Sequence, residues 1–136
     1  YVQGGTLGPA SLVASLPAFL MTFNLLLLNE FPDEEADRQG GRKNLVLMFG
    51  RPRAALIYAM AALLVPVWIL GAAFLGALPP WAILGALPSV LLAGPLRWAF
   101  GNTAEEVPIP AMGANVIWNL ATNTLLGIGL FLAALL

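Results

Sequence analysis

Neither cysteine nor histidine occurs among the 136 residues of the chain. Without cysteine the chain can form no disulfide, no thiolate metal site and no thiol nucleophile, and its redox compartment cannot be inferred. Without histidine it lacks the commonest general base and the commonest zinc ligand. These absences exclude disulfide scaffolds, thiol enzymes and zinc sites built from cysteine or histidine.

Charge is scarce as well, because the sequence has only 6 basic and 7 acidic residues, or 10% charged against about a quarter in ordinary soluble domains. All but Arg97, Glu105 and Glu106 of these lie between Glu30 and Arg53. The net charge of -1 leaves no basic patch, so we expect no nucleic-acid partner. The remaining sequence is almost free of charge and 60% of the residues are hydrophobic, which predicts a protein of the lipid bilayer.

The long charge-free segments predict membrane-spanning helices, each of which needs about 20 apolar residues. We expect an all-α membrane protein with four transmembrane helices, over residues 7–28, 55–78, 80–99 and 112–135. Pro79 and Pro80, followed by Trp81, predict the turn between the second and third helices. A soluble helical core would need polar outer faces, and none of these segments has one.

The charged segment 29–53 is predicted to be an aqueous loop, because a charged side chain at the bilayer centre costs about 2.5–3.5 kcal/mol. Its five Lys and Arg residues place the loop on the cytoplasmic side of the cell membrane by the positive-inside rule. Both ends of the chain are then expected outside.

Within this loop, Pro32 and the pair Gly40-Gly41 predict a short helix over about 32–39. On such a helix Asp33 and Asp37 are i, i+4 neighbours, with Cβ atoms roughly 5–6 Å apart. Two carboxylates so placed repel each other unless a cation lies between them, and Mg²⁺ is typically held by one or two carboxylates together with phosphates and water.

Arg42 and Lys43 follow this helix and offer donors that a phosphate group can use. The carboxylate pair and the basic pair together indicate a site for a metal-bound diphosphate. The alternative is a solvated loop whose charges only set the membrane topology.

The loop sequence NEFPDEEADRQGGRKNLV, residues 29–46, resembles the second aspartate-rich motif of the UbiA-type intramembrane prenyltransferases. The similarity is strongest with the branch that acts on 1,4-dihydroxy-2-naphthoate in menaquinone biosynthesis. Family members are bundles of nine membrane helices, with cytoplasmic active-site loops after helices two and six. The resemblance implies that the four predicted spans are helices six to nine, the C-terminal half of such an enzyme.

The resemblance also implies residue roles. Asp33 and Asp37 would be catalytic and would bind Mg²⁺, and Asn29 would help to position that cluster at the diphosphate. Arg42 and Lys43 would contact diphosphate oxygens. The reaction would transfer a polyprenyl group from a prenyl diphosphate to an aromatic acceptor.

An earlier family motif, N-D-x-x-D-x-x-x-D, is not found in this sequence. We therefore expect a missing N-terminal half as a partner, and we expect this half alone to be inactive.

The last predicted span carries amides at i, i+4 and i+8, which are Asn115, Asn119 and Asn123. They should face the interior of the bundle, since polar groups are costly against lipid. They either form hydrogen bonds between helices or, for Asn115 and Asn119, line the acceptor pocket near the cytoplasmic end.

Several other functions remain open at this point. Within the same family the acceptor can be 4-hydroxybenzoate, homogentisate, a chlorophyll precursor or an archaeal glycerol lipid. From another class, the chain could be a transporter segment. Transporters usually place ionisable residues near the bilayer midplane, whereas every such position here lies in a charge-free segment. A non-catalytic membrane scaffold is the third alternative.

Overall fold

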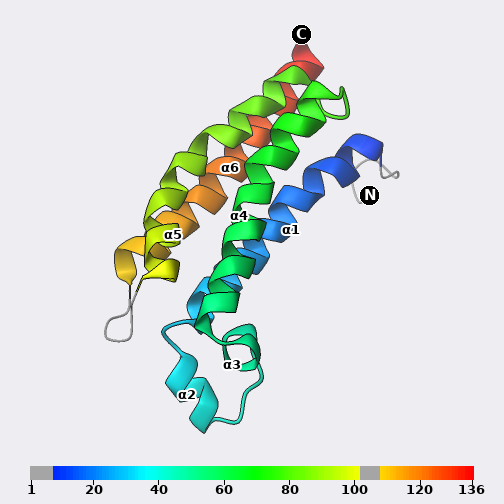
Figure 1. The fold of residues 1–136 in the computed structure, drawn as a ribbon. Helices are drawn as coiled ribbons and strands as arrows, with labels where there is room; N and C mark the ends of the chain where they lie inside the picture. Colours follow the sequence, from blue (N-terminus) through cyan, green and yellow to red (C-terminus); the bar gives the residue numbers. More distant parts are fainter. Residues whose placement is uncertain (1–7, 102–107) are drawn as a thin grey trace.

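A computed structural model describes residues 8–101 and 108–136 of the chain, and all of the regular elements in these ranges are helices. The long elements are α1 (Pro9–Glu30), α4 (Arg51–Phe74), η1 (Pro80–Leu92) continued by α5 (Ala93–Phe100), and α6 (Ile109–Leu135). They run side by side as an elongated bundle, and the short helices α2 (Glu34–Gln39) and α3 (Leu45–Phe49) lie together at one end (Figure 1). Leu7, Glu105 and Glu106 lie outside the described residues.

The all-α prediction is confirmed, and the described residues contain four helices long and apolar enough to cross a membrane: Pro9–Glu30, Arg51–Phe74, Pro80–Phe100 and Ile109–Leu135. Their ends differ from the predicted ones. The second begins at Arg51 instead of Ala55, because Gly50 turns the chain at φ 77° and Pro52 suits a first helical turn. Outer faces of the bundle carry large exposed apolar side chains such as Phe19, Met60 and Phe131, as expected for contact with lipid.

Proline inside these helices removes a backbone donor, and the structure shows one compensation. Pro17 lies within α1, so the carbonyl oxygen of Val13 has no N–H group to accept from four residues later. That oxygen accepts a hydrogen bond from Nε1 of Trp68 on α4, at 2.9 Å. A neighbouring helix therefore supplies the donor that the proline lacks, as membrane helices require.

The helices η1 and α6 approach each other closely, and this contact depends on glycine. A Cβ atom at Gly129 would overlap the backbone carbonyl of Trp81, and one at Gly85 would lie 3.0 Å from Cβ of Leu126. Small residues at helix contacts let backbones approach closely in membranes, where packing rather than hydrophobic burial holds helices together.

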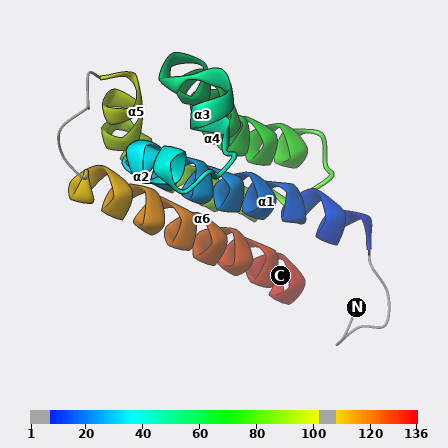
Figure 2. The same cartoon turned by 90° about the horizontal axis from the view of Figure 1, so that it is seen from below.

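The loop end of the bundle is anchored by a buried apolar cluster. It contains Leu27, Leu28, Phe31, Val46, Ala54, Ala55, Tyr58 and Ala99. Phe31 makes an edge-on contact with Trp98 at 5.6 Å between ring centroids, and the guanidinium of Arg51 lies 5.7 Å from the Phe31 ring centre. Seen from below, α2 lies in front of the end of α1 and α3 lies against α4 (Figure 2). The charged loop is thus fixed onto the bundle.

Candidate active site

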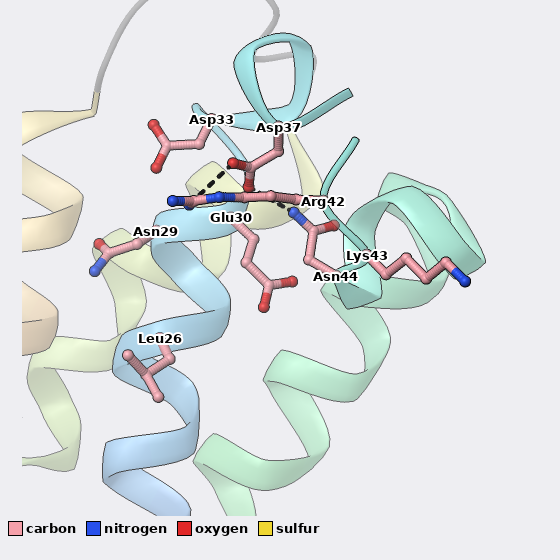
Figure 3. A pocket seen from close by; sticks show the side chains of 8 residues that line it. All are labelled: Leu26, Asn29, Glu30, Asp33, Asp37, Arg42, Lys43 and Asn44. Carbon is pink, nitrogen blue, oxygen red and sulfur yellow. Dashed lines mark hydrogen bonds and ion pairs between the residues drawn. The ribbon is translucent and has the colours of Figure 1, made fainter. Parts of the chain in front are cut away.

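A cleft of about 420 Å³ opens at the loop end of the bundle. Its lining consists of Leu26, Asn29, Glu30, Asp33, Asp37, Arg42, Lys43 and Asn44 (Figure 3). The structure therefore brings together in one cleft all five loop residues that the sequence suggested for metal and diphosphate binding. Their roles stay predictions.

The two aspartates are placed by the start of α2. Asp33 is the N-cap residue, and the backbone N–H of Asp37 donates to the Asp33 carbonyl oxygen at 2.8 Å, which gives the helical i, i+4 relation. The predicted helix over 32–39 is shorter in the structure and begins at Glu34. The reason is that Phe31 is buried in the core, so the chain turns over Phe31–Asp33 before a helix can begin. The helix ends as predicted, with Gly40 as its C-cap.

The two carboxylates have different surroundings. The side chain of Asp37 is only 12% exposed; its Oδ1 accepts from Nη1 of Arg42 at 3.2 Å and its Oδ2 from Nδ2 of Asn44 at 2.8 Å. Asp33 is exposed, and its carboxylate has no hydrogen bond or ion pair within the described residues. One carboxylate is therefore fixed by its neighbours, while the other is available to a ligand.

Arg42 reaches across the cleft to Asp37 (Figure 3), although its side chain is 75% exposed. Lys43 lines the cleft, but its ammonium group extends away from Asp33 and Asp37 (Figure 3). Asn29 lies on the last turn of α1 and is partly buried. Of the two predicted cations, Arg42 is therefore the one that contacts a carboxylate of the pair, that of Asp37.

Two polar residues of the cleft had no role in the sequence prediction. Asn44 is the N-cap of α3 and accepts from the N–H of Leu47 at 2.8 Å. Glu30 reaches the same helix end, where its Oε2 accepts from the N–H groups of Leu45 at 2.9 Å and Val46 at 3.4 Å. An asparagine directly before an apolar run is a helix-start signal that the sequence does offer. Glu30 gives no such signal, because its partners are distant in sequence.

The other charged residues of α2 are not part of the cleft lining. Arg38 forms exposed ion pairs with Glu34 at 2.8 Å and with Glu35 at 3.2 Å. Exposed pairs of this kind contribute at most about 1 kcal/mol. They support α2 locally and are separate from the cleft.

The predicted acceptor-pocket residues lie elsewhere. Asn115 is buried between α4 and α6, and its Oδ1 accepts from the hydroxyl of Tyr58 at 2.9 Å. Asn119 is partly buried and accepts from Nδ2 of Asn123 at 2.9 Å. Neither Asn115 nor Asn119 lines the cleft. The bond between Tyr58 and Asn115 joins two helices, as the alternative interpretation expected, whereas the bond between Asn123 and Asn119 lies within α6. Asn123 is exposed, so the expectation that all three amides face the interior is wrong for this residue. The part of Asn115 and Asn119 in acceptor binding stays a prediction.

Four long apolar helices with a carboxylate-lined and cation-lined cleft at one end define an α-helical membrane protein with a polar site at its loop end. The chain belongs to the UbiA prenyltransferase family, whose family model matches residues 1–120.

The chain is also similar to a 1,4-dihydroxy-2-naphthoate octaprenyltransferase of Bacillus subtilis (strain 168), with 27% identity over 136 residues. The match covers 98% of this chain but only 43% of the relative, in its C-terminal part. The chain therefore spans less than half the length of this relative. No solved structure gives a significant match.

Proposed function

We propose that the chain is the C-terminal half of an integral-membrane, Mg²⁺-dependent prenyltransferase. The whole protein would transfer a polyprenyl group from a prenyl diphosphate to an aromatic acceptor, and 1,4-dihydroxy-2-naphthoate is the acceptor we favour. The observation that carries this proposal is the cleft, in which Asp33, Asp37 and Arg42 lie together in a member of a prenyltransferase family. The missing half would complete the site.

The donors of the cleft fit magnesium. Carboxylate oxygens are hard ligands, and Mg²⁺ is commonly held by one or two carboxylates plus substrate phosphates and water. Asp33 and Asp37 supply two carboxylates to the cleft, which is the number that a site of this type uses. When bound, Mg²⁺ would offset negative charge on the leaving diphosphate.

Arg42 supports diphosphate binding because it can exchange one anion for another. Its contact with Asp37 is a single hydrogen bond at 3.2 Å, and its side chain is largely exposed. A diphosphate offers the guanidinium two parallel hydrogen bonds, which are stronger and more directional than one. Arg42 would then stabilise the charge that develops as the carbon–oxygen bond breaks. Lys43, on a flexible stem, would contribute a second positive charge.

The membrane position follows from the same segment. Five Lys and Arg residues lie in the 29–53 segment, so we place the cleft at the cytoplasmic face of the cell membrane. A prenyl diphosphate would present its charged head to this cleft and its apolar chain to the bundle and the lipid. Water would be kept from the allylic cation by the apolar surroundings.

The proposal is tested with the full-length protein in membrane vesicles, given a prenyl diphosphate, Mg²⁺ and separate acceptors. The acceptors are 1,4-dihydroxy-2-naphthoate, 4-hydroxybenzoate, homogentisate, a chlorophyll precursor and a glycerol lipid. We expect prenylated dihydroxynaphthoate as the main product. Product with a different acceptor only would overturn the acceptor assignment, and product with none of them would overturn the proposed activity.

The site is tested with Asp33→Asn, and Glu35→Gln on the outer face of α2 is the matched control. Losing a residue that merely supports a metal ligand costs about 10–100-fold in metal affinity or activity. Losing the ligand itself should cost at least the upper end of that range, while the control should keep full activity. Undiminished product with Asp33→Asn would refute the site, and product formed after complete metal removal would refute the role of Mg²⁺.

A further inference from the structure

Asn44 connects the carboxylate of Asp37 to the start of α3. Its Oδ1 accepts from the N–H of Leu47 at 2.8 Å, and its Nδ2 donates to Oδ2 of Asp37 at 2.8 Å. Because Oδ1 accepts one hydrogen bond and Nδ2 donates the other, only one orientation of the Asn44 amide is compatible with both bonds. The direction of the donor to Asp37 is therefore set by the helix end.

The helix end is itself held in place. Glu30, on the last turn of α1, accepts from the N–H of Leu45 at 2.9 Å. Val46 is 1% exposed and belongs to the buried cluster that anchors the loop. Asn44 therefore links the carboxylate of Asp37 to a helix end whose position is fixed by α1 and the buried cluster.

Arg42, the other partner of Asp37, is held differently. Its side chain is 75% exposed and bonds the carboxylate at 3.2 Å, so it can leave when a diphosphate arrives. Asn44 cannot leave without uncapping α3. A carboxylate has about four lone-pair positions, and Asn44 takes one of those on Oδ2. The rest of the carboxylate stays available to a cation once Arg42 has moved.

We propose that Asn44 is a positioning residue that fixes the carboxylate of Asp37 in the orientation needed to bind a divalent cation. The inference rests on the proposed function, because it concerns the metal site of that reaction. It adds a residue whose contribution passes through Asp37 and not through substrate. Partners of this kind orient metal ligands, and their loss typically costs 10–100-fold in metal affinity.

The experiment separates the helix cap from the bond to Asp37. Asn44→Ser keeps a good N-cap acceptor for α3 but has no amide donor, whereas Asn44→Ala loses both. Gln39→Ser is the matched control, because Gln39 also donates an amide hydrogen bond to a carboxylate, that of Glu35 at 3.0 Å, on the exposed face of α2. All variants are made in the full-length protein in detergent. Thermal unfolding and Mn²⁺ binding, by the electron paramagnetic resonance signal of free Mn²⁺, are measured.

We expect Asn44→Ser to unfold at the wild-type temperature and to need about tenfold or more Mn²⁺ for half-saturation. Asn44→Ala should lose the same affinity and also unfold at a lower temperature. Gln39→Ser should match wild type in both measurements. Wild-type Mn²⁺ affinity in Asn44→Ser would overturn the inference, because a residue that only caps α3 predicts that result.

A further variant, Asp33→Asn, distinguishes this failure from failure of the proposed function. Mn²⁺ binding that is present in the wild type and lost in Asp33→Asn can be assigned to the cleft. If wild type shows no such binding, the magnesium role in the proposed function is wrong and the inference falls with it. If that binding is present but unchanged in Asn44→Ser, only the role of Asn44 is wrong.

Discussion

Gly129 on α6 offers a quantitative test of how the bundle is packed. A methyl group added there would overlap the carbonyl oxygen of Trp81, and it would lie 2.7 Å from the carbonyl carbon and 3.0 Å from the N atom of Ala82. These are backbone atoms, which cannot rotate away as a flexible side chain can. Since carbon atoms pack best at about 3.5–4.0 Å, Gly129→Ala must push η1 and α6 apart. Overpacking of this kind costs about 1–3 kcal/mol of unfolding free energy.

Gly127 provides the control on the same helix, because a Cβ atom there would meet nothing within 4 Å. Gly127→Ala should therefore gain up to about 1 kcal/mol from helix propensity alone. Gly129→Ala gains the same propensity on the same helix, so the two variants should differ by the overpacking cost alone, about 1–3 kcal/mol. The measurement is denaturant unfolding of the full-length protein in detergent micelles. Equal unfolding free energies for the two variants would refute the close contact between η1 and α6.

Two further predictions use the same unfolding measurement. Tyr58→Phe removes the donor to the buried Oδ1 of Asn115, whose Nδ2 already lacks a partner among the described residues; it should cost about 1–3 kcal/mol, and adding Asn115→Leu should recover part of the loss. A double variant no more stable than Tyr58→Phe alone would contradict this. Trp68→Phe should cost about 1 kcal/mol by removing the donor to the Val13 carbonyl oxygen, and less in a Pro17→Ala background, where alanine restores the helical donor. If Trp68→Phe lowered the unfolding free energy equally in both backgrounds, Trp68 would not compensate for the proline.

The fold was predictable because the bilayer restricts what an uncharged segment can do. A charge-free run long enough to span lipid has to be helical, so the number of spans followed from where charges are absent. The helix ends did not follow. The start of α4 at Arg51 lies outside the apolar run, where Gly50 turns the chain and Pro52 suits the first helical turn. Arg51 also contacts other segments, because its guanidinium lies over Phe31 and its Nη1 is 3.7 Å from Oε2 of Glu34. Hydropathy gives the length of a span, whereas the turn residues beside the apolar run and the contacts of the charged residues there decide where the helix begins.

The same division applies to the cleft. The pairing of Asp33 with Asp37 was predictable, because it depends on helical spacing within one turn. The contacts of Glu30 with Leu45 and of Asn44 with Asp37 join residues that do not belong to the same helix, so helical spacing could not predict them. The sequence also could not show that Arg42 turns toward Asp37 while Lys43 points away, since adjacent side chains on an irregular segment have no fixed relative direction.

Stability and metal binding should be separable in this protein. Each side-chain bond to Asp37 comes from Arg42 or Asn44, and α3, which directs Asn44, is held by Glu30. All of these groups lie in the loop or at the end of α1, whereas Gly129 packs against Trp81 on the first turn of η1. Gly129 belongs to the C-terminal part of α6, and the C-terminal end of α6 lies at the opposite end of the bundle from α2 and α3 (Figure 1). Substitutions at two sites that are this far apart and share no contacting residue have independent effects. Gly129→Ala should therefore lower the unfolding free energy and leave the Mn²⁺ affinity of the folded protein unchanged, whereas Asn44→Ser should do the reverse. If Gly129→Ala also weakens Mn²⁺ binding, the cleft depends on packing along the whole bundle and is not set by the loop alone.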